Sequence, residues 1–162
     1  MFTRNRKGLT AKGVKPICIF QQVFKSLYLF GAYSPITGDH FELELPECNT
    51  ETFQLFLDNF SETNPDELKI MLLDNGKFHK GKKLVIPKNI VLLFIPPYSP
   101  ELNPSEKIWW KFKRQFSGKL HKTLENVSEF ISTQVNSLTK KEIKSICGFE
   151  YILSSLFWAK TY

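Results

Sequence analysis

Two carboxylate side chains, Asp74 and Glu106, stand where the sequence indicates a strand end and a helix start. Asp74 directly follows the short apolar run 70–73. Glu106 closes the segment 103–106, Asn-Pro-Ser-Glu, which is a helix-start pattern and follows the apolar run 90–95. In an open α/β sheet, ligands bind at the strand ends. Two carboxylates that meet there can hold a hard divalent cation through oxygen ligands.

Each carboxylate also has an ordinary structural interpretation. An aspartate before Asn75-Gly76 is commonly a turn residue that accepts a hydrogen bond from its own backbone. Glu106 at the third helical position would complete a capping box with Asn103 and would complement the helix dipole. The second interpretation is compatible with metal binding, because the same placement favours the ionised carboxylate.

Longer motifs surround the two carboxylates: LLDNGKFHK (72–80) and LFIPPYSPELNPSEKIWWKFK (93–113). With TAKGVKP (10–16) and LFGAYSPITGDHF (29–41), they resemble the catalytic core of insertion-sequence transposases of the mariner superfamily. The resemblance covers most of the chain up to about residue 118. It implies an α/β fold of the RNase H-like class, with a mixed sheet of an antiparallel hairpin and parallel strands, flanked by helices.

In that family an Asp-Asp-Glu triad binds two metal ions, Mg²⁺ or Mn²⁺. The resemblance places Asp74 at the second aspartate and Glu106 at the glutamate, with family-like spacing. The family's first aspartate, on the first central strand, lies upstream of the segment that matches residues 4–16, whereas the first acidic residue here is Asp39 in a turn. We therefore expect this chain to lack that strand, the first aspartate and the family's N-terminal helix-turn-helix region.

The function that the resemblance implies is DNA transposition, through metal-dependent strand cleavage and strand transfer at insertion-sequence ends. We expect this chain alone to be inactive or impaired. One alternative is a non-catalytic nucleic-acid-binding protein in which Asp74 and Glu106 are structural. Another is an RNase H-like nuclease that recruits Asp39 or Glu101 as its third carboxylate. Whether the chain is an enzyme by itself stays open at this point.

Positive charge is concentrated around the two motifs. The net charge is +6, and the segment 70–122 carries most of the excess of lysine and arginine over acids. Such a surface suits phosphate contacts with nucleic acid, although a solvated basic face is the simpler alternative. The expected nucleic-acid contacts are Lys77, His79, Lys80, Lys82, Lys83, Trp110, Lys113 and Arg114.

The elements expected to position these residues follow from hydrophobic periodicity. Residues 27–45 are typical of an antiparallel hairpin, and the strict alternation in 41–45 predicts a strand with one solvated face. A helix is expected from Asn49 or Thr50 to about residue 64, with an apolar face. The runs 68–73 and 90–95 are apolar enough to predict parallel strands buried on both faces.

The C-terminal part is expected to be helical. A helix from Pro104 should turn Ile108, Phe112 and Phe116 to the core, and further helices should follow Gly118. We therefore divide the chain into a partial catalytic domain, 1–118, and a helical extension of the same domain, 119–162.

Length and composition fit one folded domain of 162 residues. No apolar run approaches the ~20 residues that a membrane span needs, and no signal pattern precedes the first motif, so a cytoplasmic protein without a membrane partner is expected. Cys18, Cys48 and Cys147 form no disulfide or zinc pattern and are expected to be reduced and mostly buried. The partners expected are DNA, as transposon ends and target, a transposase segment encoded in an upstream frame, and a second copy of the chain.

Overall fold

The computed structural model describes residues 26–117, 121 and 123–159. Its elements in chain order are β1 (Tyr28–Tyr33), β2 (His40–Leu45), α1 (Thr50–Glu62), β3 (Lys69–Leu73), the 3-10 helix η1 (Lys77–Lys80), β4 (Ile90–Phe94), the 3-10 helix η2 (Pro100–Leu102), α2 (Ser105–Phe116), α3 (Leu124–Asn136), α4 (Lys140–Cys147) and α5 (Glu150–Ala159). Residues 4–16 of this chain, which belong to the part that resembles the family, lie outside the described residues.

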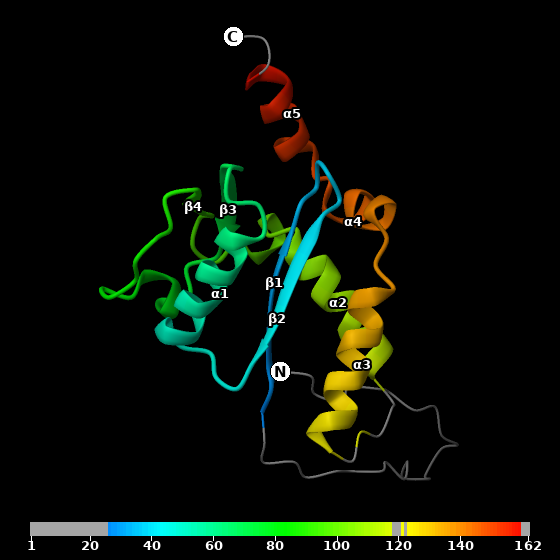
Figure 1. The fold of residues 1–162 in the computed structure, drawn as a ribbon. Helices are drawn as coiled ribbons and strands as arrows, with labels where there is room; N and C mark the ends of the chain where they lie inside the picture. Colours follow the sequence, from blue (N-terminus) through cyan, green and yellow to red (C-terminus); the bar gives the residue numbers. More distant parts are fainter. Residues whose placement is uncertain (1–25, 118–120, 122, 160–162) are drawn as a thin grey trace.

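The predicted antiparallel hairpin is confirmed. β1 pairs with β2 in a register that sets Tyr28 opposite Leu45 and Tyr33 opposite His40. The connecting turn reaches Gly38 with a φ of 77°, a left-handed conformation that glycine adopts without strain. Figure 1 shows this hairpin running through the middle of the molecule, with α1 on one side and α2, α3 and α4 on the other.

The predicted parallel strands are also confirmed. β3 and β4 pair in parallel, with Lys69 opposite Ile90 and Leu73 opposite Phe94. Among the described residues, the four strands form two separate pairs, β1 with β2 and β3 with β4, and no strand joins one pair to the other. Each pair therefore keeps strand edges whose backbone groups have no ladder partner within the described part of the chain.

One helix, α1, covers both strand pairs from the same side. Asn49 caps it: the Asn49 side chain accepts from the Thr52 N–H at 2.8 Å, and the Thr52 hydroxyl accepts from the Asn49 N–H at 3.0 Å. Its buried face packs against inward residues of both strand pairs in one cluster, whose buried members are Leu45, Phe53, Phe56, Leu57, Met71, Leu73 and Ile90. This shared core connects the two strand pairs through α1.

The prediction that both faces of β3 and β4 are buried is wrong. Alternate side chains point away from α1 and are exposed: Ile70 by 63%, Val91 by 42% and Leu93 by 47%. In the described residues only the face toward α1 belongs to a buried cluster. Sequence hydrophobicity alone could not distinguish a covered face from an uncovered apolar one.

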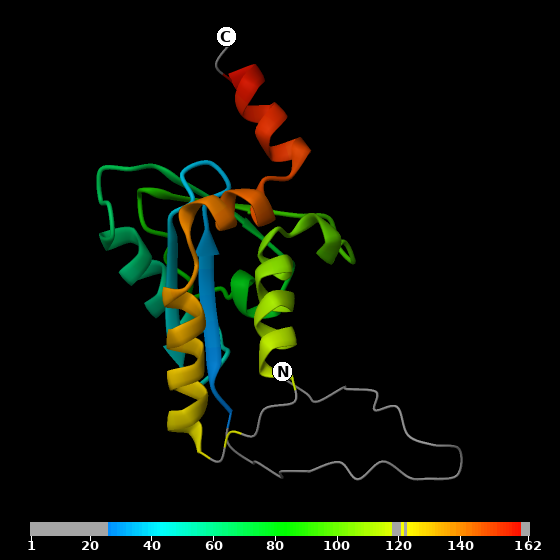
Figure 2. The ribbon, with the colours of Figure 1, turned by 90° about the vertical axis from the view of Figure 1, so that its right-hand side faces the viewer.

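The second face of the hairpin is covered as well, which corrects the expectation of a solvated face in 41–45. Leu29 and Tyr33 of β1 pack against the cluster of α2 and α4, which includes Ile108, Phe112 and Ile143. Glu42, which was expected in solvent, has a side chain only 7% exposed. Figure 2 shows α2 and α3 flanking the hairpin in the view turned by 90°.

The C-terminal helices are confirmed, and their caps follow the sequence. The Thr139 hydroxyl accepts from the Glu142 N–H at 3.2 Å at the start of α4, and Gly148 ends that helix. In both views α5 extends away from the rest of the molecule (Figures 1 and 2). No helix within the described ranges is both long enough and apolar enough to cross a membrane.

The cysteine expectation is confirmed only in part. Cys147 is fully buried between α2 and α4, where burial raises the pKa of its thiol to about 11. Cys48 is a free thiol too, but it is exposed. Cys18 lies outside the described residues.

Candidate active site

Asp74 leaves the carboxyl end of β3 and is half-exposed, with 55% of its side chain open to solvent. Its Oδ1 accepts a hydrogen bond from the Gly76 N–H at 2.9 Å, which is the turn contact that the sequence suggested. The His79 Nε2 lies 3.3 Å from the same oxygen. Both contacts use Oδ1, so Oδ2 is left available for a further ligand within the described structure.

The ring of His79 is buried, and not solvent-facing as a basic loop would suggest. Its side chain is 10% exposed and its ring lies against Phe53, at 4.4 Å between centroids, and against Phe78, at 4.0 Å. Burial lowers the pKa of His79, and the negative charge of Asp74 offsets part of that shift. A neutral imidazole therefore orients Asp74 at neutral pH.

The ends of β3 and β4 are tied together beside Asp74. The Ile95 N–H donates to the Leu73 carbonyl at 2.9 Å, and the Asn75 side-chain amide donates to the Ile95 carbonyl at 2.5 Å. Lys80 donates to the Asn75 side-chain oxygen and lies 4.8 Å from the ring centroid of Phe94. These contacts fix the strand end from which Asp74 projects.

Glu106 lies in the first turn of α2 and is exposed. The expected capping box is wrong: α2 begins at Ser105, and the Asn103 N–H donates to the Pro100 carbonyl and not to Glu106. Asn103 still helps to start the helix, because its side-chain oxygen accepts from the Ser105 N–H at 3.1 Å. Within the described residues the Glu106 carboxylate has no hydrogen-bond or ion-pair partner and is free to bind a ligand.

The position of Glu106 depends on how α2 docks onto the hairpin. Ile108 and Phe112 are almost fully buried, as predicted. Trp109 packs edge-on against Tyr33, with centroids 5.6 Å apart, and its ring approaches Gly31 so closely that a Cβ there would lie 2.8 Å from it. Glycine at position 31 therefore allows the helix that carries Glu106 to approach β1.

The described residues do not gather three metal ligands. No group of three His, Cys, Asp or Glu side chains suited to a metal ion occurs among them. All 16 acidic residues of the sequence fall in the described ranges. Asp74 and Glu106 are thus two oxygen donors on separate elements, the end of β3 and the first turn of α2, and no set of three metal ligands forms among the described residues.

The two residues considered as alternative ligands differ in their surroundings. Asp39 lies in the hairpin turn, where Lys140 approaches it to 2.6 Å; this hydrogen-bonded ion pair lowers the pKa of Asp39. Glu101 lies in η2 and lines the same cavity as Glu106. Of the two, Glu101 is the one near the candidate site.

The residues expected to contact nucleic acid form two groups. Lys77, Lys82 and Lys83 are exposed between β3 and β4. Lys113, Arg114 and Trp110 lie on the outer side of α2, where Trp110 is 61% exposed and the Arg114 guanidinium carbon lies 5.3 Å from the Trp110 ring centroid. His79 and Lys80 are instead engaged with Asp74 and Asn75, as described above.

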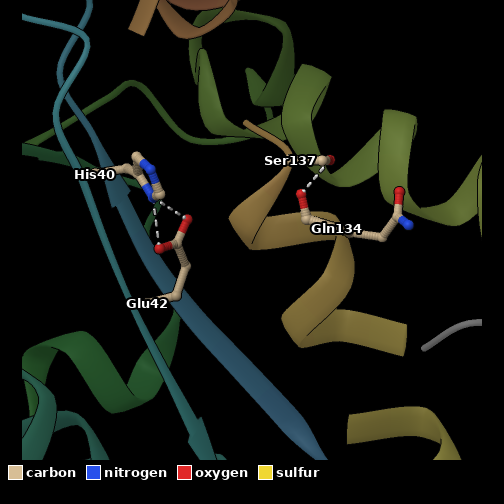
Figure 3. Close-up of polar contacts among 4 residues, drawn as sticks. All are labelled: His40, Glu42, Gln134 and Ser137. Carbon is tan, nitrogen blue, oxygen red and sulfur yellow. Dashed lines mark hydrogen bonds and ion pairs between the residues drawn. The ribbon is translucent and has the colours of Figure 1, made fainter. Parts of the chain in front are cut away.

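Sequence reasoning missed a buried polar cluster on the hairpin (Figure 3). The His40 Nδ1 lies 2.8 and 3.0 Å from the two Glu42 oxygens, and Tyr33 stacks on His40 with centroids 6.4 Å apart. Burial raises the pKa of Glu42, against a smaller opposing effect of His40, and also raises the pKa of Tyr33. Gln134 of α3 is 8% exposed and its side-chain oxygen has no partner among the described residues; Figure 3 shows this side chain directed away from His40 and Glu42. The alternation in 41–45 indicated which side chains of this strand share a face, but not that this face would be covered.

We expect Glu42→Gln to stabilise the fold at about pH 8 by about 1 kcal/mol, because it removes a buried charge and keeps the oxygen that faces His40. The folded-state pKa of Glu42 is raised, so the folded protein favours the protonated carboxyl group. Below the ordinary pKa Glu42 is neutral, as glutamine is; as the pH rises through the raised pKa, the carboxyl ionises and the folded state loses stability. The gain should therefore shrink near pH 3.5. Urea unfolding of both proteins at the two pH values measures the free energy of unfolding. An equal difference in that free energy at both pH values would contradict the prediction.

Comparison with known proteins assigns this chain to a family. The family model described as "DDE superfamily endonuclease" matches residues 2–128. The uncharacterized protein y4pE/y4sA of Sinorhizobium fredii is 35% identical over 120 residues, which cover 72% of this chain and 88% of that protein.

Two solved structures share the fold. The Mos1 strand transfer complex matches with a TM-score of 0.68 at 16% identity over 90% of this chain, and the Mos1 transposase paired-end complex with left transposon end matches with a TM-score of 0.68 at 18% identity. This chain spans about half of the Mos1 chains, 46% and 47%. The expected α/β fold of the RNase H-like class is thereby confirmed, and the chain belongs to the DDE superfamily endonuclease family.

Proposed function

We propose that this chain supplies two carboxylates, Asp74 and Glu106, to a metal-dependent site that cleaves and joins DNA strands at insertion-sequence ends. The observation that carries the proposal is the state of these side chains: each projects from an element end with a carboxylate oxygen open to a ligand. Membership of the DDE superfamily endonucleases supports the reaction class. The two Mos1 structures, a strand transfer complex and a paired-end complex with a transposon end, support DNA as the partner.

The donor set fits a hard divalent cation in its chemistry, because Asp74 and Glu106 offer carboxylate oxygens and lie outside the hydrophobic core. Asp74 and Glu106 would hold Mg²⁺ or Mn²⁺. A pair of such ions would activate a water or a 3′-hydroxyl and neutralise charge on the leaving oxygen of a phosphodiester. The chain's own contribution is positioning: Gly76 and His79 fix Asp74, and the packing of Trp109 against Gly31 fixes the helix of Glu106.

Among the described residues no three ligands gather, and we propose that a third carboxylate comes from another polypeptide segment. We assign it to a strand, such as a segment encoded in an upstream frame, that pairs with the edges of β1 and β3 that have no ladder partner among the described residues. Pairing there would join the two strand pairs into one sheet and bring a strand end beside Asp74. A second copy of the chain is the other expected partner, since an insertion sequence has two ends. Cytoplasmic localisation stays a prediction.

The test is a strand-cleavage assay in Mn²⁺ on a DNA that carries the insertion-sequence ends. We would compare this chain alone with the chain fused to the residues encoded directly upstream of it. Cleavage by the fusion alone supports the proposal. Cleavage by the short chain alone would mean that another carboxylate, with Glu101 as the first candidate, completes the site. Binding of DNA without cleavage in either form would favour the alternative of a non-catalytic DNA-binding protein.

The exposed lysines between β3 and β4 should act as phosphate contacts. We expect Lys82→Ala/Lys83→Ala to weaken DNA binding and to lower the slope of log K against log salt by about 2, because each phosphate contact contributes about 0.9. Lys141→Ala/Lys144→Ala removes the same charge from the exposed side of α4 and is the matched control. Anisotropy titrations at several salt concentrations measure both slopes. Equal slopes for the two double variants would contradict the assignment.

A further inference from the structure

The solvent-facing side of α1 carries a row of acidic side chains with one leucine among them. The members of this acidic row recur every three or four residues along one stripe of the helix: Glu51, Leu55, Asp58 and Glu62. All four side chains are exposed, and Leu55 is exposed by 47%. Within the described ranges, none of the three carboxylates takes part in an ion pair. The row therefore offers negative charges to a partner.

A second segment runs alongside α1 in the same direction. It is the connection between η1 and β4, residues 81–89, which lies on the side of α1 away from the hairpin (Figure 1). Three contacts join it to the helix in matching order: Gly81 with Thr50, Val85 with Gln54, and Asn89 with Ser61. The Gln54 side chain accepts from the Val85 N–H at 2.7 Å and donates to the Val85 carbonyl at 2.8 Å. The Ser61 hydroxyl donates to the Asn89 side-chain oxygen at 2.6 Å.

This basic segment, residues 81–89, is opposite in charge to the acidic row. Lys82, Lys83 and Lys88 are exposed, and none of them takes part in an ion pair within the part of the chain that the structure describes. Between them, Val85 is 71% and Ile86 46% exposed, although both are apolar. The acidic row and the basic segment thus form one surface, with exposed apolar side chains at its centre and opposite charges on its two sides.

We infer that this surface docks onto the same surface of a second copy of the chain. A contact between identical surfaces must be self-complementary. A two-fold axis that is parallel to α1 and runs between the two rows sets the acidic row of each copy on the basic segment of the other. Such an axis also keeps the order along the rows, so Glu62 faces the partner's Lys88 and Leu55 faces the partner's Val85. Apolar contacts at the centre exclude water, and the charge pairs around them fix the register.

The DNA contacts proposed above remain compatible with this dimer. Lys82 and Lys83 lie at one end of the surface, level with the start of α1, where Glu51 is the single acidic member of the row. Two lysines that meet one carboxylate leave a net positive charge for phosphates. Docking itself requires neither a metal ion nor DNA, so it goes beyond strand cleavage and can be tested separately from it.

The test is sedimentation velocity of the full chain at several protein concentrations, which gives the Kd of the dimer. Glu62→Lys and Lys88→Glu each place like charges at both symmetry-related contacts, so each should raise the Kd at least about tenfold. An equimolar mixture of the two variants should restore the Kd to within about threefold of the unsubstituted value, because every contact in the mixed dimer again joins opposite charges. A charge effect confined to one chain would give no such recovery on mixing.

Val85→Asp should abolish the dimer, because it places a charge at the apolar centre of the contact. Ile70→Asp is the matched control: Ile70 is 63% exposed on the open face of β3 and β4, and its substitution should leave the Kd unchanged. Loss of the dimer in Ile70→Asp but not in Val85→Asp would move the interface to that open face and overturn the inference. A monomeric unsubstituted chain at about 100 μM, or a mixture that associates no better than the single variants, would overturn it too. None of these results bears on the cleavage assay, which tests the proposed function.

Discussion

Glu106→Gln is expected to lower metal-dependent DNA strand cleavage by about 1,000-fold in the assembly that supplies the third carboxylate. The substitution removes the negative charge of one metal ligand and keeps the size of the side chain in the first turn of α2. Metal ions contribute several kcal/mol of charge stabilisation to a transition state, and about 4 kcal/mol corresponds to three orders of magnitude in rate. Single-turnover cleavage of a labelled transposon end in Mn²⁺ measures the effect.

Glu101→Gln is the matched control, because Glu101 lines the same cavity and is also exposed. Its cleavage rate should stay within about threefold of the unsubstituted rate. A large loss of cleavage rate in Glu101→Gln with a small loss in Glu106→Gln would mean that Glu101, and not Glu106, is the metal ligand. That outcome would support the nuclease alternative. Circular dichroism of both variants should be unchanged, since neither carboxylate has a packing or hydrogen-bond role in the described structure.

Phe53→Ala is expected to cost about 3–5 kcal/mol of the free energy of unfolding, the usual range for removing a buried phenyl ring. Phe53 is 1% exposed, and its ring packs against Phe30, Phe56 and His79. The cavity left behind also admits water to the imidazole of His79. The pKa of His79, which burial lowers in the intact protein, should therefore rise toward its ordinary value.

Urea unfolding gives the stability change, and an NMR titration of the His79 ring follows its pKa. Phe53→Leu keeps most of the buried volume, so its cost should be clearly smaller than that of Phe53→Ala. A cost below about 1 kcal/mol for Phe53→Ala would show that α1 does not unite the two strand pairs. An unchanged pKa of His79 in a folded Phe53→Ala variant would contradict the link between this core and Asp74.

The elements that carry the candidate site were largely predictable, because local signals in the sequence agree with the fold. The alternation in 41–45 marks β2, the apolar runs before Asp74 and Pro96 mark two parallel strands, and Asn49 caps α1 as proposed. Caps and periodicity act within a few residues, so a single sequence reveals them.

The covering of faces was not predictable, because it depends on residues distant in the sequence. Glu42 alternates with apolar neighbours as a solvated residue would, yet its side chain is only 7% exposed, on the hairpin face whose residue Tyr33 packs against α2 and α4. Ile70 and Val91 look like core residues, yet they are exposed. Phe149 carries no local signal at all, and only the packing of α4 on α2 brings it to the cavity beside Glu106.

The open apolar face of β3 and β4 bears on how long the chain survives in a cell. Within the described part of the chain, exposed side chains such as Ile70 and Leu93 lie next to strand edges without a ladder partner, and such features promote aggregation and attract chaperones and proteases. A polypeptide in this state is continuously sorted between refolding, assembly and degradation. If a further strand pairs with these edges, as proposed above, the abundance of the protein in a cell should depend on how fast that strand is supplied relative to proteolysis.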